Sequence, residues 1–172
     1  MIGRRRMLGF VLAAPFALNG CGWTPLYADI DTGAADDELR SIKVETIPER
    51  IGQRLALGLR QSLNPQGVET PKRYSLRTVL SVTRADTGIQ STGLGSRGRL
   101  DVSATFTLSD LRTNTLMLNN TIHVADSFDI VASGYSSVVA EEDARNRAVE
   151  ELRRDMLTKL TLFLQSRAAG AA

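Results

Sequence analysis

Hydrophobic and polar residues alternate in four parts of this chain, a pattern typical of strands with one buried face. It predicts strands over residues 39–47, 73–84, 100–108 and 116–128. The third strand has the clearest alternation, and its apolar positions are Leu100, Val102, Ala104, Phe106 and Leu108. Residues 110–114 are rich in turn-forming residues, so we expect the third and fourth strands to form an antiparallel hairpin.

Two other segments repeat their apolar residues at every third or fourth position, which is the spacing of one helix face. The first follows Pro48 and ends at Asn64 and Pro65, because proline suits a first helical turn and stops a helix elsewhere. The second is long, begins at the capping residues Ser136 or Ser137 and ends near Ser166. On its polar side we expect four ion pairs one turn apart, namely Glu141–Arg145, Asp143–Arg147, Glu150–Arg154 and Asp155–Lys159.

The element order β-α-β-β-β-α predicts an α+β fold, in which two helices pack on a four-stranded, mostly antiparallel sheet. We expect residues 39–166 to form this single domain, with a flexible tail at 167–172. Residues 21–38 show no hydrophobic period and are predicted to form the N-terminal part of the mature chain and a tether.

The N-terminal residues have the pattern of an export signal. Three arginines, Arg4 to Arg6, precede an apolar run over 7–18 that is too short to cross a bilayer. The run ends in Leu18-Asn19-Gly20-Cys21, which resembles a bacterial lipoprotein signal. Such a signal implies that residues 1–20 are removed and that Cys21 becomes the acylated first residue.

Two alternatives for this segment stay open. An ordinary secretory signal would be cleaved near Ala17 or Gly20, and Cys21 would then be a chance cysteine. Export through the Sec route is the default, although the arginines also resemble part of a twin-arginine signal.

Removing residues 1–20 changes the charge of the chain. The whole sequence has a pI of about 9.0, but the signal contains three of the 21 basic residues and none of the 19 acidic ones. The mature chain therefore has a net charge near −1 and no basic block, so nothing indicates a nucleic-acid partner. Acylation of the single cysteine would leave no thiol for a disulfide or a metal. We expect neither a cofactor nor a metal site.

Three motifs with possible chemistry have a structural interpretation. Residues 93–98 match G-x-G-x-x-G, but a dinucleotide site needs a helix after the glycines, whereas a strand is predicted here; we expect a mobile hairpin loop. His123 is the only histidine, on the polar face of the fourth strand, and we interpret it as a surface residue, although a spatial Ser-His-Asp triad stays open. Glu141, Glu142 and Asp143 are expected in a first helical turn, where acids stabilise the helix dipole.

Arg97 and Arg99 are the candidate ligand-binding residues. Their alternate spacing would place both guanidinium groups on one side of the third strand, where they could bind a phosphate in a bidentate manner. A phosphorylated glycolipid is a suitable ligand for a protein of the cell envelope. The alternative is that both are solvated residues at the end of a loop.

The segment Cys21-Gly22-Trp23-Thr24-Pro25-Leu26-Tyr27 resembles the mature start of the LptE family of lipopolysaccharide-assembly lipoproteins, in its alphaproteobacterial form. Further similar motifs are Ile47-Pro48-Glu49-Arg50, Ser96-Arg97, Ala104 to Asp110, and Asp143-Ala144 with Arg147-Ala148. The resemblance extends over the mature chain.

This resemblance implies a non-enzymatic outer-membrane lipoprotein with acyl chains, palmitate among them, on its N-terminal cysteine. The family's members plug the LptD β-barrel, aid its assembly and take part in transport of lipopolysaccharide to the outer leaflet. Arg97 and Arg99 are the implied candidates for lipopolysaccharide contact. A periplasmic lipoprotein that activates cell-wall synthesis or assists a lipid transporter is the alternative, since small α/β domains on tethers serve there too.

Overall fold

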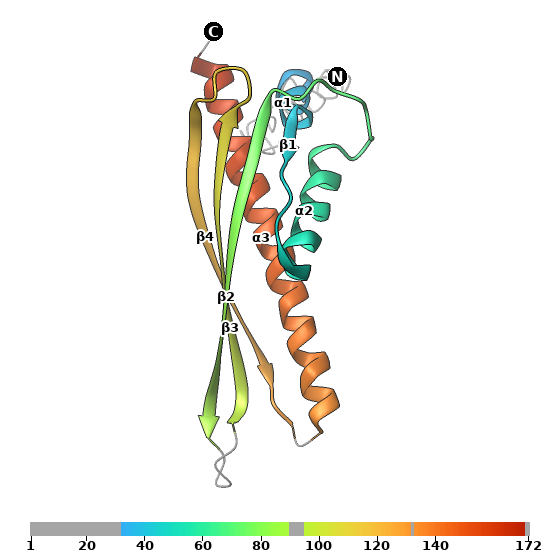
Figure 1. Ribbon diagram of the computed structural model, residues 1–172, viewed down its shortest axis with the longest axis vertical. Coiled ribbons are helices and arrows are strands. Elements are labelled where there is room, and N and C mark those ends of the chain that lie inside the picture. Colours follow the sequence, from blue (N-terminus) through green and yellow to red (C-terminus); the bar gives the residue numbers. More distant parts are fainter. Residues whose placement is uncertain (1–31, 90–94, 132, 171–172) are drawn as a thin grey trace, which may run out of the picture. The chain divides into compact units, whose positions relative to one another are not determined.

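The computed structural model describes residues 32–89, 95–131 and 133–170, and the predicted signal, Cys21 and the Trp23–Tyr27 motif lie outside them. From β1 onward the elements follow the predicted β-α-β-β-β-α order (Figure 1). They are α1 (Thr32–Arg40), β1 (Ile42–Val44), α2 (Glu49–Leu63), β2 (Tyr74–Ile89), β3 (Gly95–Asp110), β4 (Leu116–Asp129) and α3 (Gly134–Gly170).

The four strands form one sheet in the order β1-β2-β3-β4. β1 is parallel to β2, and its three residues pair with Tyr74, Ser75 and Leu76. β2 with β3, and β3 with β4, are long antiparallel pairs. The predicted α+β fold with a mostly antiparallel sheet is therefore confirmed, and β1 makes the sheet mixed.

Helices α2 and α3 pack against one another and cover one face of this sheet (Figure 1). The even-numbered residues of β3 from Leu100 to Leu108 are buried beneath them, as the alternation predicted. The apolar ridge of α3 meets this layer, with Ala144, Ala148, Leu152, Met156, Leu160 and Leu164 all buried. Because only one sheet face is covered, buried and more exposed residues alternate along residues 98–108 of β3 and 121–125 of β4.

Some boundaries differ from the predictions. Helix α1 takes up residues 32–38 of the predicted tether, because Glu38 accepts hydrogen bonds from Arg73 Nη1 (2.9 Å) and from Tyr74 Oη (2.8 Å) on β2. Helix α3 continues to Gly170, four residues into the predicted tail, since alanine favours helix there. Strand β2 ends at Ile89 and strand β3 begins at Gly95. Residues 90–94, which the structure does not describe, lie between them, so this connection is shorter than the one predicted between strands 73–84 and 100–108.

Of the four ion pairs predicted along α3, the described residues form the pair of Arg145 with Glu141. Arg147 instead binds Asp126 on β4, with Nε and Oδ2 2.8 Å apart. Arg153 bonds to Glu150 and to Ser62 on α2. Arg145 therefore pairs within α3, Arg147 joins α3 to β4, and Arg153 does both.

Candidate functional site

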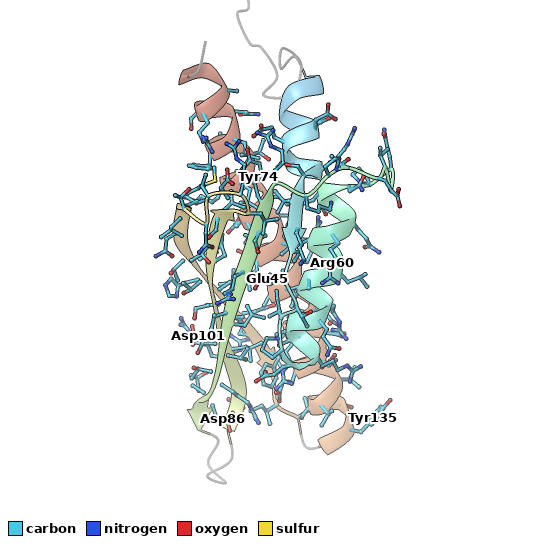
Figure 2. All side chains as sticks on the ribbon, turned by 45° about the horizontal axis from the view of Figure 1, so that its top comes forward. Glu45, Arg60, Tyr74, Asp86, Asp101 and Tyr135 are labelled. Carbon is cyan, nitrogen blue, oxygen red and sulfur yellow. The ribbon has the colours of Figure 1, made fainter. Side chains whose placement is uncertain are left out.

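The sheet face opposite α2 and α3 is a polar surface formed by described residues. We call it the open face; its residues come from alternate positions of β2, β3 and β4. They are Arg77, Val79, Ser81, Thr83, Arg99, Asp101, Ser103, Thr105, Thr107, Asn119, Thr121, His123, Ala125 and Ser127. Figure 2 shows Asp101 on this side of the sheet, away from α2. No described helix covers the open face, so its side chains are available to a partner.

Hydroxyl groups dominate the middle of the open face. Thr105 and Thr121 join their hydroxyl oxygens across β3 and β4 at 3.0 Å. Val79, whose side chain is 63% exposed, is the one large hydrophobic residue among those named for this face. The open face therefore offers hydroxyl and charged groups to a partner, and it lacks the contiguous apolar patch that marks many protein-interaction sites.

A shallow hollow in the open face contains His123. Its other polar lining residues are Ser81, Thr83, Arg99, Asp101 and Ser103. His123 lies opposite Ser103 in the strand register, but no hydrogen bond joins His123 to Ser103 or Asp101 in the described part of the chain. Asp101 binds Arg99 instead. Ser103, His123 and Asp101 therefore do not form the chain of contacts that a catalytic triad needs.

Arg97 and Arg99 both lie on this side of β3, and each has an acidic partner. Arg99 donates hydrogen bonds to Asp101 from two nitrogens, with Nε 3.0 Å and Nη2 2.9 Å from Oδ1. Arg97 Nε lies 3.4 Å from Asp129 Oδ1 on β4. The hydrogen bond from Arg99 lowers the pKa of the Asp101 carboxyl, and the same bond raises the pKa of Arg99. A phosphate ligand would have to compete with these carboxylates, and the proposed contact with lipopolysaccharide stays a prediction.

The glycine motif leads into β3 rather than into a helix. Gly98 is buried and lies opposite Phe128 of β4, and a Cβ on Gly98 would overlap the aromatic ring, with Cε1 only 2.6 Å away. The ring also contacts Arg84, whose guanidinium carbon is 5.6 Å from the ring centroid. The role of Gly98 is thus to accommodate Phe128.

The acidic run at 141–143 was placed wrongly by the sequence prediction. Helix α3 begins at Gly134, so these residues are not in its first turn, which contains no acid. Glu141 contacts Arg84 of β2 at 3.6 Å, and Glu142 contacts Arg54 of α2 at 3.1 Å. The two carboxylates join α3 to its neighbours, which agrees with a structural rather than a catalytic role.

An exposed apolar patch at the start of α3 was missed by the sequence reasoning. It consists of Val131, Tyr135, Val138 and Val139, with Tyr135 81% exposed. Figure 2 shows Tyr135 pointing away from the helices and the sheet. The spacing of residues 135, 138 and 139 defines a second helix face beside the buried ridge, and this was the available signal.

Other kinds of site are not found in the described residues. These residues contain no group of three or more His, Cys, Asp or Glu side chains placed to hold a metal ion. None of the described helices has the length and apolar character needed to cross a membrane.

The fold and the sequence place the chain among known proteins. A family model described as LptE, lipopolysaccharide-assembly, matches residues 39–160, which is most of the chain. The chain belongs to the LptE family. The match begins just before β1 and ends within α3, so the open face of the LptE domain lies inside it.

Solved structures agree with this LptE assignment. A candidate lipoprotein from Caulobacter crescentus has 25% identity and a TM-score of 0.61, over 77% of this chain and 97% of its own. A minor lipoprotein from Acinetobacter baumannii has 17% identity and a TM-score of 0.53, over 70% of this chain and 90% of its own, and it shows the fold alone. No curated protein sequence matches the chain. Membership of the LptE family makes this chain a membrane-associated lipoprotein of lipopolysaccharide assembly, in a non-enzymatic family.

Proposed function

We propose that this chain is an outer-membrane lipoprotein that plugs the LptD β-barrel, aids its assembly and takes part in lipopolysaccharide transport without catalysing a reaction. The observation that supports this proposal is the open face. A β-barrel lumen is polar, and a plug needs a polar surface that does not drive self-association. The hydroxyl-rich open face over β2, β3 and β4 meets that requirement.

The anchor in this proposal is Cys21 with its acyl chains. A single acyl chain binds a membrane only marginally, whereas two or more hold a protein firmly. Family membership supports the lipoprotein assignment, and the sequence Leu18-Asn19-Gly20-Cys21 supplies the attachment site. In this proposal the fold beyond the cysteine recognises the partner, and the anchor sets the location.

The proposed barrel partner is tested by placing a photoreactive amino acid at Thr105, in the middle of the open face. In cells that express both proteins at native levels, we expect Thr105 to crosslink to inward-facing residues of LptD strands. Recovery of the chain without a barrel, combined with no crosslink to a barrel from Thr105 or Val79, would overturn the plug proposal.

The proposed contact with lipopolysaccharide combines Arg97 and Arg99 with the apolar patch. Arg97 is paired with Asp129, which is two residues before Val131 of that patch. A molecule with phosphate groups and acyl chains matches both features, because guanidinium groups bind phosphate in a bidentate manner and the valines offer apolar contact. Its phosphates would replace the carboxylates of Asp101 and Asp129.

Replacing Arg97 and Arg99 together with Gln should weaken binding of purified lipopolysaccharide about tenfold or more, because a hydrogen bond to a charged group contributes about 1.5–3 kcal/mol. Displacement of a fluorescent lipopolysaccharide measures the change. Arg77→Gln is the matched control, since Arg77 lies on the open face and is ion-paired with Glu45 at 3.0 Å. An equal loss in the control would show that general positive charge, and not this pair, is responsible.

A further inference from the structure

Strand β4 forms a free edge of the sheet. It has 14 residues, from Leu116 to Asp129, and pairs with β3 on one side. Within the described residues no strand pairs with its other side. In an antiparallel strand, alternate residues direct their backbone N–H and C=O groups outward, so a long edge offers a row of unpaired hydrogen-bonding groups.

Most of this edge lacks the features that usually protect a strand from pairing. Natural edges contain charged residues, proline or bulges, yet residues 118–125 include no Lys, Arg, Asp, Glu or Pro, and the register shift with β3 lies before them, between Leu116 and Leu118. The free part of β2, beyond its short pairing with β1, is different, because Arg77, Arg84 and Asp86 lie along it. The contrast between the two edges singles out β4 as the edge that accepts a partner.

A second copy of this chain fits the edge poorly. Helix α3 packs mainly against β4, and Arg147 and Arg167 of α3 reach Asp126 and Met117 on that strand. Two copies paired through β4 would bring their α3 helices together on the same sheet face, over strands about 4.8 Å apart. Packed helices need about 8–10 Å between their axes. A lone extended segment has no helix to accommodate and avoids this conflict.

We infer that, before the barrel closes, the outer edge of β4 binds an extended strand of the barrel partner by addition to the sheet; a closed barrel has no free strand edge. The added strand would place alternate side chains beside Thr121, His123 and Ala125 on the open face. The remaining side chains would lie beside Ile122 and Val124, which are buried under α3. A strand that alternates polar and apolar residues matches both sides, and such strands build outer-membrane barrels. This inference rests on the proposed function, because it takes its partner from it.

The test places a photoreactive residue, one variant at a time, at Asn119, Thr121, His123 and Ala125, which are successive open-face positions of β4. In cells where barrel assembly is stalled, captured residues are mapped by mass spectrometry, with intact outer membranes as the comparison in which the barrel is closed. We expect a ladder in which each two-residue step along β4 moves the captured residue two positions along one LptD strand. Thr105 on β3 is the control for contact with the barrel without strand addition, because β3 already has a neighbouring strand on both sides.

Crosslinks from β4 that scatter over several barrel segments, capture of a second copy, or no crosslink from β4 would each overturn strand addition. If Thr105 still captures the barrel in those cases, the plug proposal stands; if neither strand captures it, the plug proposal fails as well. A second comparison uses charge. His123→Lys should lower the ladder yield several-fold, whereas Gln61→Lys, which adds the same charge at an exposed position of α2 outside the open face, should leave it unchanged. Thermal unfolding of both variants confirms that they are folded.

Discussion

Replacing Phe128 with Ala should lower the free energy of unfolding by about 3–5 kcal/mol, the usual range for removing a buried aromatic side chain. Phe128 is only 5% exposed and fills the space above Gly98. Its removal also ends the contact with Arg84, which links β2 to Glu141 of α3. Denaturation in urea, followed by circular dichroism, measures the loss.

A second substitution, at Gly98, tests the same contact, because a side chain at Gly98 would occupy the space that the Phe128 ring fills. Gly98→Ala should lower the free energy of unfolding by about 1–3 kcal/mol through overpacking, since ring atoms lie 2.6 and 2.7 Å from the new Cβ. Combined with Phe128→Ala the same change should be close to neutral, so the two losses should not add. Gly134→Ala is the control, because nothing lies within 4 Å of its added Cβ. Additive losses would show that glycine is not required at position 98 to accommodate the Phe128 ring.

The strands and the two main helices could be predicted because one buried face imposes a repeating pattern on the sequence. β3 is the best example: its apolar residues alternate from Leu100 to Leu108, and the structure buries all of them. The ridge of α3 was equally readable, since an apolar residue recurs near every fourth position. Periodicity reports burial, and one side of each element is buried over the residues that show the period, Leu100 to Leu108 and Ala144 to Leu164.

Features that depend on long-range contacts were not readable in this way. Helix α1 has no hydrophobic period, and its Glu38 is hydrogen-bonded to Arg73 and Tyr74, more than 30 positions away. The partner of Arg97 is Asp129, 32 residues away. The partner of Arg99 was within reach of prediction, because Asp101 is two positions later in the same strand and therefore on the same face.

The polar residues of the open face could be predicted from the sequence, but the exposure of that face could not. Alternation gave the polar residues of each strand, such as Ser103, Thr105 and Thr107, but not whether a second layer covers them. That depends on both helices packing on the same face, and the sequence patterns of α2 and α3 do not say which face each one takes. The apolar patch around Tyr135 was overlooked because the ridge from Ala144 to Leu164 accounted for the helix by itself.

Replacing Cys21 with Ala, in a chain exported by a cleavable signal peptide, should release the protein from the membrane into the periplasmic fraction. Each buried methylene contributes about 0.8 kcal/mol to membrane binding, so loss of all acyl chains removes the anchor completely. The residues matched to the LptE family begin at residue 39, well beyond the cysteine, and the open face lies within them. We therefore expect the unanchored variant to keep its affinity for the barrel in detergent solution.

On the membrane the same variant should compete poorly with the anchored chain, because an anchor raises the effective concentration and so the overall binding by about 10²- to 10⁴-fold. Copurification with the barrel from detergent, compared with occupancy of the barrel in intact cells, separates the two effects. The anchored and unanchored chains should give equal copurification and very different occupancy. Complete loss of barrel binding in detergent, with an unchanged circular dichroism spectrum, would mean that the acylated terminus itself contacts the barrel and that recognition is not confined to the folded domain.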